Sequence, residues 1–178
     1  NISFTPNDDA LFYAQWSEGF RLGKGQSLPP RDICDTNSDG LLDGTGGVLT
    51  NQINPDTTEN FEVGAKMTFL DNRFTVNAAV YQIDWADMPI SFDSATDACP
   101  LVRIQNNVGE ARSEGVELEF QYAVSSNLSL DWSLAYNEAK ITDVGGSSAS
   151  GLEIGEELPF APHSTANFGL DYSFDLGA

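Results

Sequence analysis

The chain has 178 residues, of which 40% are hydrophobic, and its 27 acidic residues against 8 basic ones give a formal net charge of -19. Such a chain cannot neutralise a phosphate backbone, which excludes nucleic acid as a partner and equally disfavours a polybasic attachment to anionic lipid. No apolar run is long enough for a membrane-spanning helix, so an integral membrane protein with this sequence would have to be a closed β-barrel.

The two ends of the sequence suggest an excerpt from a longer protein. The N-terminus, Asn1 onwards, has neither an initiator Met nor a charged segment followed by an apolar one, so no targeting signal is visible. The last residues, 173–178, stop as if a turn had just begun. The missing signal therefore says nothing against export.

The first predicted strand runs from Ala10 to Phe20 and follows a turn at residues 6–9. Its large apolar side chains, among them Phe12 and Trp16, recur at every second position, which is the period of extended chain. Residues 21–56 then show little periodicity and many Gly, Pro, Asp and Asn residues. They predict a long loop outside the sheet, of a length that compact domains keep only for a function.

Two further strands meet across a short turn at residues 70–73. Alternation runs from Thr57 to Phe69, and residues 73–92 form a second long strand with Phe74 on the same kind of face. Its Tyr81, Ile83 and Trp85 fall on the opposite face. A β-bulge would explain this change, as would aromatic side chains that line the inside near the rim. A second outer loop is expected at residues 93–100.

The clearest pattern is a hairpin within residues 106–139, with a tight turn at 125–127. One face of each arm is apolar and the other polar; the apolar positions are Val116, Leu118, Phe120 and Tyr122, then Leu128, Leu130, Trp132, Leu134 and Tyr136. A soluble sheet also alternates, so the pattern alone does not identify the solvent on either side. Both arms reach the 9 to 11 or so residues that cross a bilayer, whereas ordinary strands have about 5 or 6. Their length favours a membrane.

A third outer loop is predicted at residues 144–157, before a last strand from about Leu158 to Phe174. Long loops thus alternate with short turns, and every long one lies at the same end. This asymmetry, with aromatic residues near strand ends, is the signature of outer-membrane barrels. The predicted fold is all-β: a segment of an antiparallel up-and-down transmembrane β-barrel.

Four stretches resemble the later barrel portion of TonB-dependent outer-membrane receptors, and together they cover nearly the whole chain apart from the loops. They are LFYAQWSEGFR, NPDTTENFEVGAKMTFLDNRFTVNAAVYQIDWADM, NNVGEARSEGVELEFQYAVSSNLSLDWSLAYNEAKI and ELPFAPHSTANFGLDY. Paired positions that match are Glu59 and Gly64, Asn107 and Gly109, Gly115 and Glu117, and Pro159 and Pro162.

The resemblance implies a barrel of about 22 strands in the outer membrane of a Gram-negative bacterium, occluded by an N-terminal plug and energised through TonB. This chain departs from the family pattern because it has no plug, no TonB box and no terminal aromatic strand. We therefore expect residues 1–178 to be part of a single barrel domain, about 6 to 7 strands of the larger barrel. Outer-membrane lipid, the plug domain, the remaining strands and TonB would be its partners.

The function implied by the resemblance is active uptake of a large, scarce nutrient, such as a ferric siderophore, a cobalamin or an oligosaccharide. Its ligand-binding residues are not identified by the sequence. Two alternatives stay open: a secreted soluble β-sandwich or adhesin module with a calcium-stabilised loop, and a small autonomous barrel with a structural or adhesive role. A requirement for detergent separates the sandwich from the barrels.

One segment has the spacing of a calcium loop. Oxygen ligands recur at alternate positions, with Gly40 where a tight turn is needed; the candidate ligands are Asp35, Asn37, Asp39, Leu41 through its carbonyl, and Asp43. An EF-hand would need Glu where Gly46 stands, and no helices are expected on either side. The alternative is a solvated acidic turn.

Cys34 and Cys99 fall in two consecutive outer loops, which would be neighbours around a barrel. Because surroundings outside the inner membrane are oxidising, we predict a disulfide between them. Two unpaired thiols are the alternative, since geometry cannot be checked from sequence.

We find no enzyme constellation in the sequence. His163 is the single histidine and has no nucleophile arranged with it. Four carboxylates that resemble acid and base pairs are better explained as the wet inner face of a barrel: Glu117, Glu119, Asp131 and Asp171. Near the first outer loop, anionic-ligand contact and ordinary rim packing explain five residues equally well: Trp16, Phe20, Arg21, Lys24 and Arg31.

Overall fold

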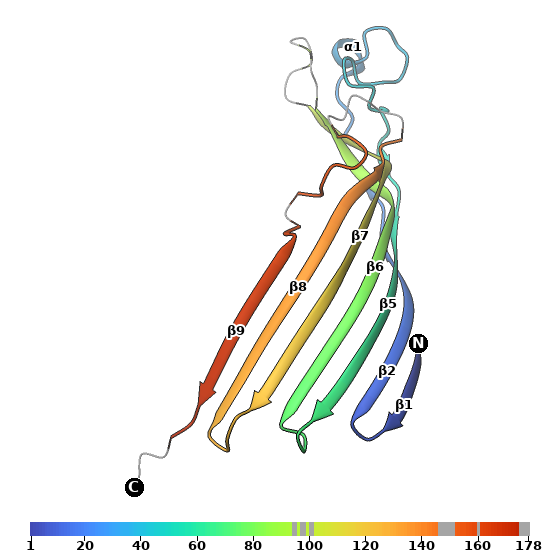
Figure 1. Ribbon diagram of the computed structural model, residues 1–178. Helices are drawn as coiled ribbons and strands as arrows, with labels where there is room; N and C mark the ends of the chain where they lie inside the picture. The colour runs from blue at the N-terminus through green and yellow to red at the C-terminus, as the bar shows by residue number, and fades with distance from the viewer. Residues whose placement is uncertain (94–95, 97–98, 100–101, 146–151, 160, 175–178) are drawn as a thin grey trace.

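The protein is built on one curved, single-layered antiparallel sheet, seen in a computed structural model that describes residues 1–93, 96, 99, 102–145, 152–159 and 161–174 (Figure 1). The sheet has seven strands in the order β1-β2-β5-β6-β7-β8-β9, each paired with the next. Their bounds are β1 Ile2–Asn7, β2 Ala10–Arg21, β5 Asp56–Phe69, β6 Phe74–Asp93, β7 Arg103–Ala123, β8 Leu128–Asp143 and β9 Ser164–Tyr172. The predicted up-and-down barrel segment is confirmed.

Short turns join the strands at one end of the sheet, and long connections lie at the other, as Figure 1 shows. The turn between β7 and β8 occupies residues 124–127, as the hairpin pattern predicted. The turn between β5 and β6 places Leu70, Asp71 and Asn72 at positive φ, a region in which Asp and Asn are more common than other non-glycine residues. In an outer-membrane barrel the long connections face outward from the cell, so we call their side the outer end.

Two strand boundaries differ from the sequence predictions. A strand, β1, precedes β2 where we had expected only a turn, and its pairing is irregular between Phe4 and Asn7, where Pro6 has no N–H to donate. The last strand begins at Ser164 instead of about Leu158. The segment before it folds back along β8, with Leu158 N–H donating to the carbonyl of Ala139 at 2.9 Å.

The first long connection contains more structure than the sequence indicated. It holds β3 (Lys24–Gly25), which pairs with β4 (Gln52–Ile53), and a single helical turn, α1 (Arg31–Cys34). Of the second and third outer loops, residues 94–95, 97–98, 100 and 146–151 lie outside the described part of the chain. Within that part, no helix has the length and apolar character needed to cross a membrane.

Strands β6 and β7 are 20 and 21 residues long, about twice what a tilted strand needs to cross a bilayer. Pairing is continuous from Phe74 opposite Tyr122 to Trp85 opposite Ala111, so the change of phase predicted at Tyr81 to Trp85 is not a bulge. Those side chains simply face inward. A bulge does follow, between Trp85 and Met88, and it keeps the next apolar residues on the same side as Trp85.

Candidate functional site: a two-faced wall and an outer knob

The outward face of the sheet carries a continuous apolar belt that the described residues do not cover with a second layer. Paired rows of apolar side chains run across the long strands, for example Ala14, Val63, Val80, Val116 and Tyr136. Trp16 is 52% exposed although it lies beside Phe61, with ring centroids 6.5 Å apart. A sandwich would bury this face. A belt this wide on a long sheet is the surface that lipid tails cover in outer-membrane barrels.

The inward face of the same strands is polar. Its side chains alternate with the belt and include all four carboxylates that the sequence analysis placed on the inner face. They are Glu117, Glu119, Asp131 and Asp171, with Glu62 and Lys66 beside them. Glu119 accepts a hydrogen bond from the Asn77 amide at 3.2 Å. The four predicted carboxylates lie in different rows of the sheet and are not paired with one another as acid and base.

Tyrosines cover glycines at two places on the inward face. Tyr13 lies directly opposite Gly64, and a Cβ added to that glycine would lie 2.4 Å from the tyrosine ring; the Tyr13 hydroxyl donates to Glu62 at 2.7 Å. Tyr81 covers Gly115 in the same way. Because glycine has no side chain, each tyrosine ring can lie flat against the neighbouring strand on the inward face.

At the outer end of the sheet lies what we call the outer knob, formed by residues 22–55, the outer ends of β6 and β7, and Cys99 in the connection between these two strands. It contains the principal buried apolar cluster: Cys34, Leu42, Leu49, Met88, Ile90, Phe92, Cys99, Ile104 and Ala111. Asn106 ties the loop to β7, since its amide donates to the Val48 carbonyl at 2.9 Å and its Oδ1 accepts from Val48 N–H at 2.8 Å. The outer parts of β6 and β7, which extend past the length needed to cross a bilayer, therefore hold the first outer loop in a folded form.

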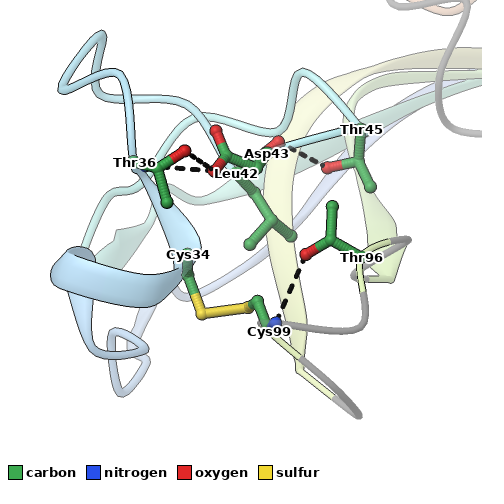
Figure 2. The surroundings of a disulfide bond; sticks show 7 residues. All are labelled: Cys34, Thr36, Leu42, Asp43, Thr45, Thr96 and Cys99. Carbon is green, nitrogen blue, oxygen red and sulfur yellow. Dashed lines mark hydrogen bonds between the residues drawn. A yellow bond between two sulfur atoms is a disulfide. The ribbon is translucent and has the colours of Figure 1, made fainter.

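A disulfide joins Cys34 and Cys99, the two cysteines that the sequence analysis paired (Figure 2). Their sulfur atoms are 2.02 Å apart, and both residues are fully buried. Figure 2 shows the bond beside Leu42, with Cys99 N–H directed at the Thr96 hydroxyl. The bond fastens the first outer loop to the second.

The predicted calcium loop is organised by hydrogen bonds within itself. Asp43 accepts from both the backbone N–H and the hydroxyl of Thr36, at 3.0 and 2.6 Å, and these bonds lower the pKa of its carboxyl. The carboxylate of Asp35 accepts from Gly40 N–H, while Asn37 donates to Asp39 at 2.8 Å. The described residues contain no group of three His, Cys, Asp or Glu side chains placed to hold a metal ion. Calcium binding stays a prediction.

Of the five residues considered near the first outer loop, Arg21 has the most specific surroundings. Its guanidinium donates to both oxygens of Asp56, at 2.9 and 2.8 Å, and lies over the Trp85 ring, 5.8 Å from its centroid. Trp85 Nε1–H donates to the same carboxylate at 2.7 Å. Asp56 is thereby buried with three donors, an arrangement that satisfies its charge.

The other four residues considered near the first outer loop do not form one site. Trp16 and Phe20 face outward on the belt side of β2. Lys24 lies in β3, and Arg31 reaches the Leu49 carbonyl at 3.5 Å. Sequence reasoning missed Asp56 as the partner of Arg21. The available signal was that each lies one residue beyond the outer end of a predicted strand, Arg21 after Phe20 and Asp56 before Thr57.

His163 contacts residues of β8 and of the segment before β9. Its Nε2 lies 2.9 Å from Glu157 Oε1, and its ring stacks on Tyr136 at 6.4 Å. Its Nδ1 lies 3.2 Å from the carbonyl oxygen of Asn137. We see a structural role for this ring and propose no reaction for it.

The chain is similar in sequence and in structure to several known proteins. The sequence is 26% identical over 126 residues to the "Probable TonB-dependent siderophore receptor PiuA" of Acinetobacter baumannii, covering 67% of this chain and 16% of that protein. In structure it is similar to the ferric yersiniabactin uptake receptor FyuA from Yersinia pestis, with a TM-score of 0.67, 20% identity and coverage of 97% of this chain and 22% of that one.

The fold is shared with the copper transporter OprC as well, at a TM-score of 0.62 and 22% identity over 97% of this chain and 23% of that one. The chain thus spans less than a quarter of each of these proteins. The family described as "TonB dependent receptor-like, beta-barrel" matches residues 1–178. Because that match extends over the whole sequence, the chain belongs to the TonB-dependent receptors and forms part of their β-barrel in the outer membrane of Gram-negative bacteria.

Proposed function

We propose that this chain supplies wall and outer loops to a receptor that takes up a ferric siderophore across the outer membrane. The observation that carries the proposal is an apolar belt that the described residues leave exposed, opposite a polar inner face, on strands long enough to cross a bilayer. A soluble sandwich would need a second layer over that belt. The plug and the remaining strands of the barrel would come from other segments of a longer protein.

The choice of siderophore over cobalamin or oligosaccharide is supported by the names of relatives. PiuA is described as a siderophore receptor and FyuA as a ferric yersiniabactin receptor. OprC, described as a copper transporter, shares the fold, so the fold by itself leaves the cargo open. Uptake against a gradient through a plugged barrel needs energy, for which TonB is the proposed partner.

The cargo is tested by uptake of radioactive iron in cells that carry or lack the full-length gene. Iron should enter from at least one ferric siderophore of a chemically varied panel, and the uptake should disappear in the gene deletion, return on complementation and disappear again when TonB is removed. Gene-dependent uptake of cobalamin or an oligosaccharide, with iron uptake unchanged, would contradict the siderophore assignment. Gene-dependent uptake that persists without TonB would contradict the energy source.

A further inference from the structure

A cleft of about 210 Å³ lies where the knob meets the inner face of the wall, lined by Arg21, Lys24, Ile53, Trp85 and Gln105 among others. Pockets for whole drug-sized ligands usually measure about 300 to 1,000 Å³. The cleft therefore has room for one arm of a large ligand. It opens on the same side of the sheet as the polar wall, because Arg21, Asp56 and Trp85 all belong to the inward rows.

The charged side chains that line the cleft sum to a net positive charge, although the whole chain has a formal net charge of -19. Its lining has two cations, Arg21 and Lys24, and one carboxylate, Asp56. Asp56 is already used: its side chain is 6% exposed and it accepts from Arg21 and Trp85. The Arg21 side chain is still 63% exposed. Among the described residues, no carboxylate forms an ion pair with Lys24.

The backbone that carries Lys24 is held in place. Gly23, just before it, comes so close to β4 that an added Cβ would lie 2.4 Å from the Ile53 carbonyl oxygen. Gln26, just after β3, donates to the carbonyls of Thr50 and Gln105 at 2.9 and 2.8 Å and accepts from Gln105 N–H. A cation on a fixed backbone binds an anion with less loss of conformational freedom than one on a mobile loop.

From this geometry we infer that the cleft binds an anionic arm of the cargo, a carboxylate, between the Lys24 ammonium and the exposed edge of the Arg21 guanidinium, with the Trp85 ring beside it. The inference deepens the proposed function, since it assigns the cargo a free carboxylate. A charge-assisted hydrogen bond from an ammonium to a carboxylate selects such a group over a neutral ester.

The test uses iron-free citrate as the probe and the full-length receptor in detergent, with saturation-transfer NMR of the citrate protons as the readout. Citrate should show transfer from the wild-type receptor, and its trimethyl ester should not. Lys24→Gln should raise the apparent dissociation constant for citrate about tenfold, the size expected for one charge-assisted hydrogen bond. Lys24→Arg should stay close to wild type.

Lys140→Gln is the control, because it removes the same charge from a side chain of β8 that does not line the cleft; it should leave the constant unchanged. Absence of transfer to citrate in the wild type, or equal constants in wild type and Lys24→Gln, would overturn the inference. Failure of the siderophore proposal is seen separately, in the iron-uptake assay, and does not alter the citrate result.

Discussion

Leu134 lies near the middle of the apolar belt, on an interior strand, and it offers a direct test of which face meets lipid. Its neighbours across the sheet are Leu118 and Ala166, and it is 45% exposed although strands flank it on both sides. An arginine at the mid-plane of a lipid-facing barrel surface costs about 2 to 4 kcal/mol. At 1.4 kcal/mol for each factor of ten, Leu134→Arg should lower the ratio of folded to unfolded receptor roughly 30- to 700-fold.

Ser133→Arg is the matched control, one residue away on the other face. Ser133 lies opposite Glu119 on the inward side, so the new cation gains an opposite charge worth about 0.2 to 1 kcal/mol. Both variants of the full-length receptor would be unfolded with urea from lipid vesicles and followed by the mobility shift of folded barrels on gels. A large loss for Ser133→Arg with none for Leu134→Arg would refute the assignment of the two faces.

Four further predictions concern the wall and the knob. Gly64→Ala should lower the free energy of unfolding of the receptor by about 1 to 3 kcal/mol, because the added methyl would displace the Tyr13 ring. The control is Gly25→Ala, whose added Cβ would have no neighbour closer than 3.8 Å. Both variants are measured by the urea titration described above. Reducing the disulfide, which spans 65 residues of sequence, should remove about 4 kcal/mol of loop restraint and make the knob sensitive to trypsin while the wall stays resistant. The carboxyl of Asp43 has its pKa lowered below the ordinary 3.8, so its contribution to knob stability is complete above that pH and is lost as the pH falls through the folded-state value. Calcium, if it binds the loop of residues 35–43, should slow trypsin cleavage of the knob in wild type and have no effect in Asp39→Asn.

Each of these has a result that would contradict it. Equal urea midpoints for the two glycine variants would show that Tyr13 yields without cost. Trypsin resistance that survives reduction would mean that packing alone holds the knob. An acid transition of the knob that is the same in Thr36→Val as in wild type would remove the Thr36 hydroxyl as the cause of the shift in the Asp43 pKa. Unchanged cleavage on adding calcium would leave the solvated acidic turn as the explanation.

The sequence alone determined the wall. Side chains of a strand point alternately to its two faces, so Val116 to Tyr122 and Leu128 to Tyr136 showed two faces without any knowledge of their neighbours. Strand length separated a bilayer from an ordinary core, and short turns such as residues 125–127 set the order of the strands. These are local properties, readable within a dozen residues.

Only the tertiary structure decided what happens at the outer end. The inward direction of Trp85 depends on pairing with β7. The bulge that follows it turns Met88, Ile90 and Phe92 into a cluster that also takes members from residues 34–49 of the first outer loop and from residues 99–111. The Arg21 and Asp56 pair joins two strands across 35 positions of sequence. Residues 22–55 lack a period because they fold against distant strands and not along one of their own, so their folded form arises from contacts that no local pattern records.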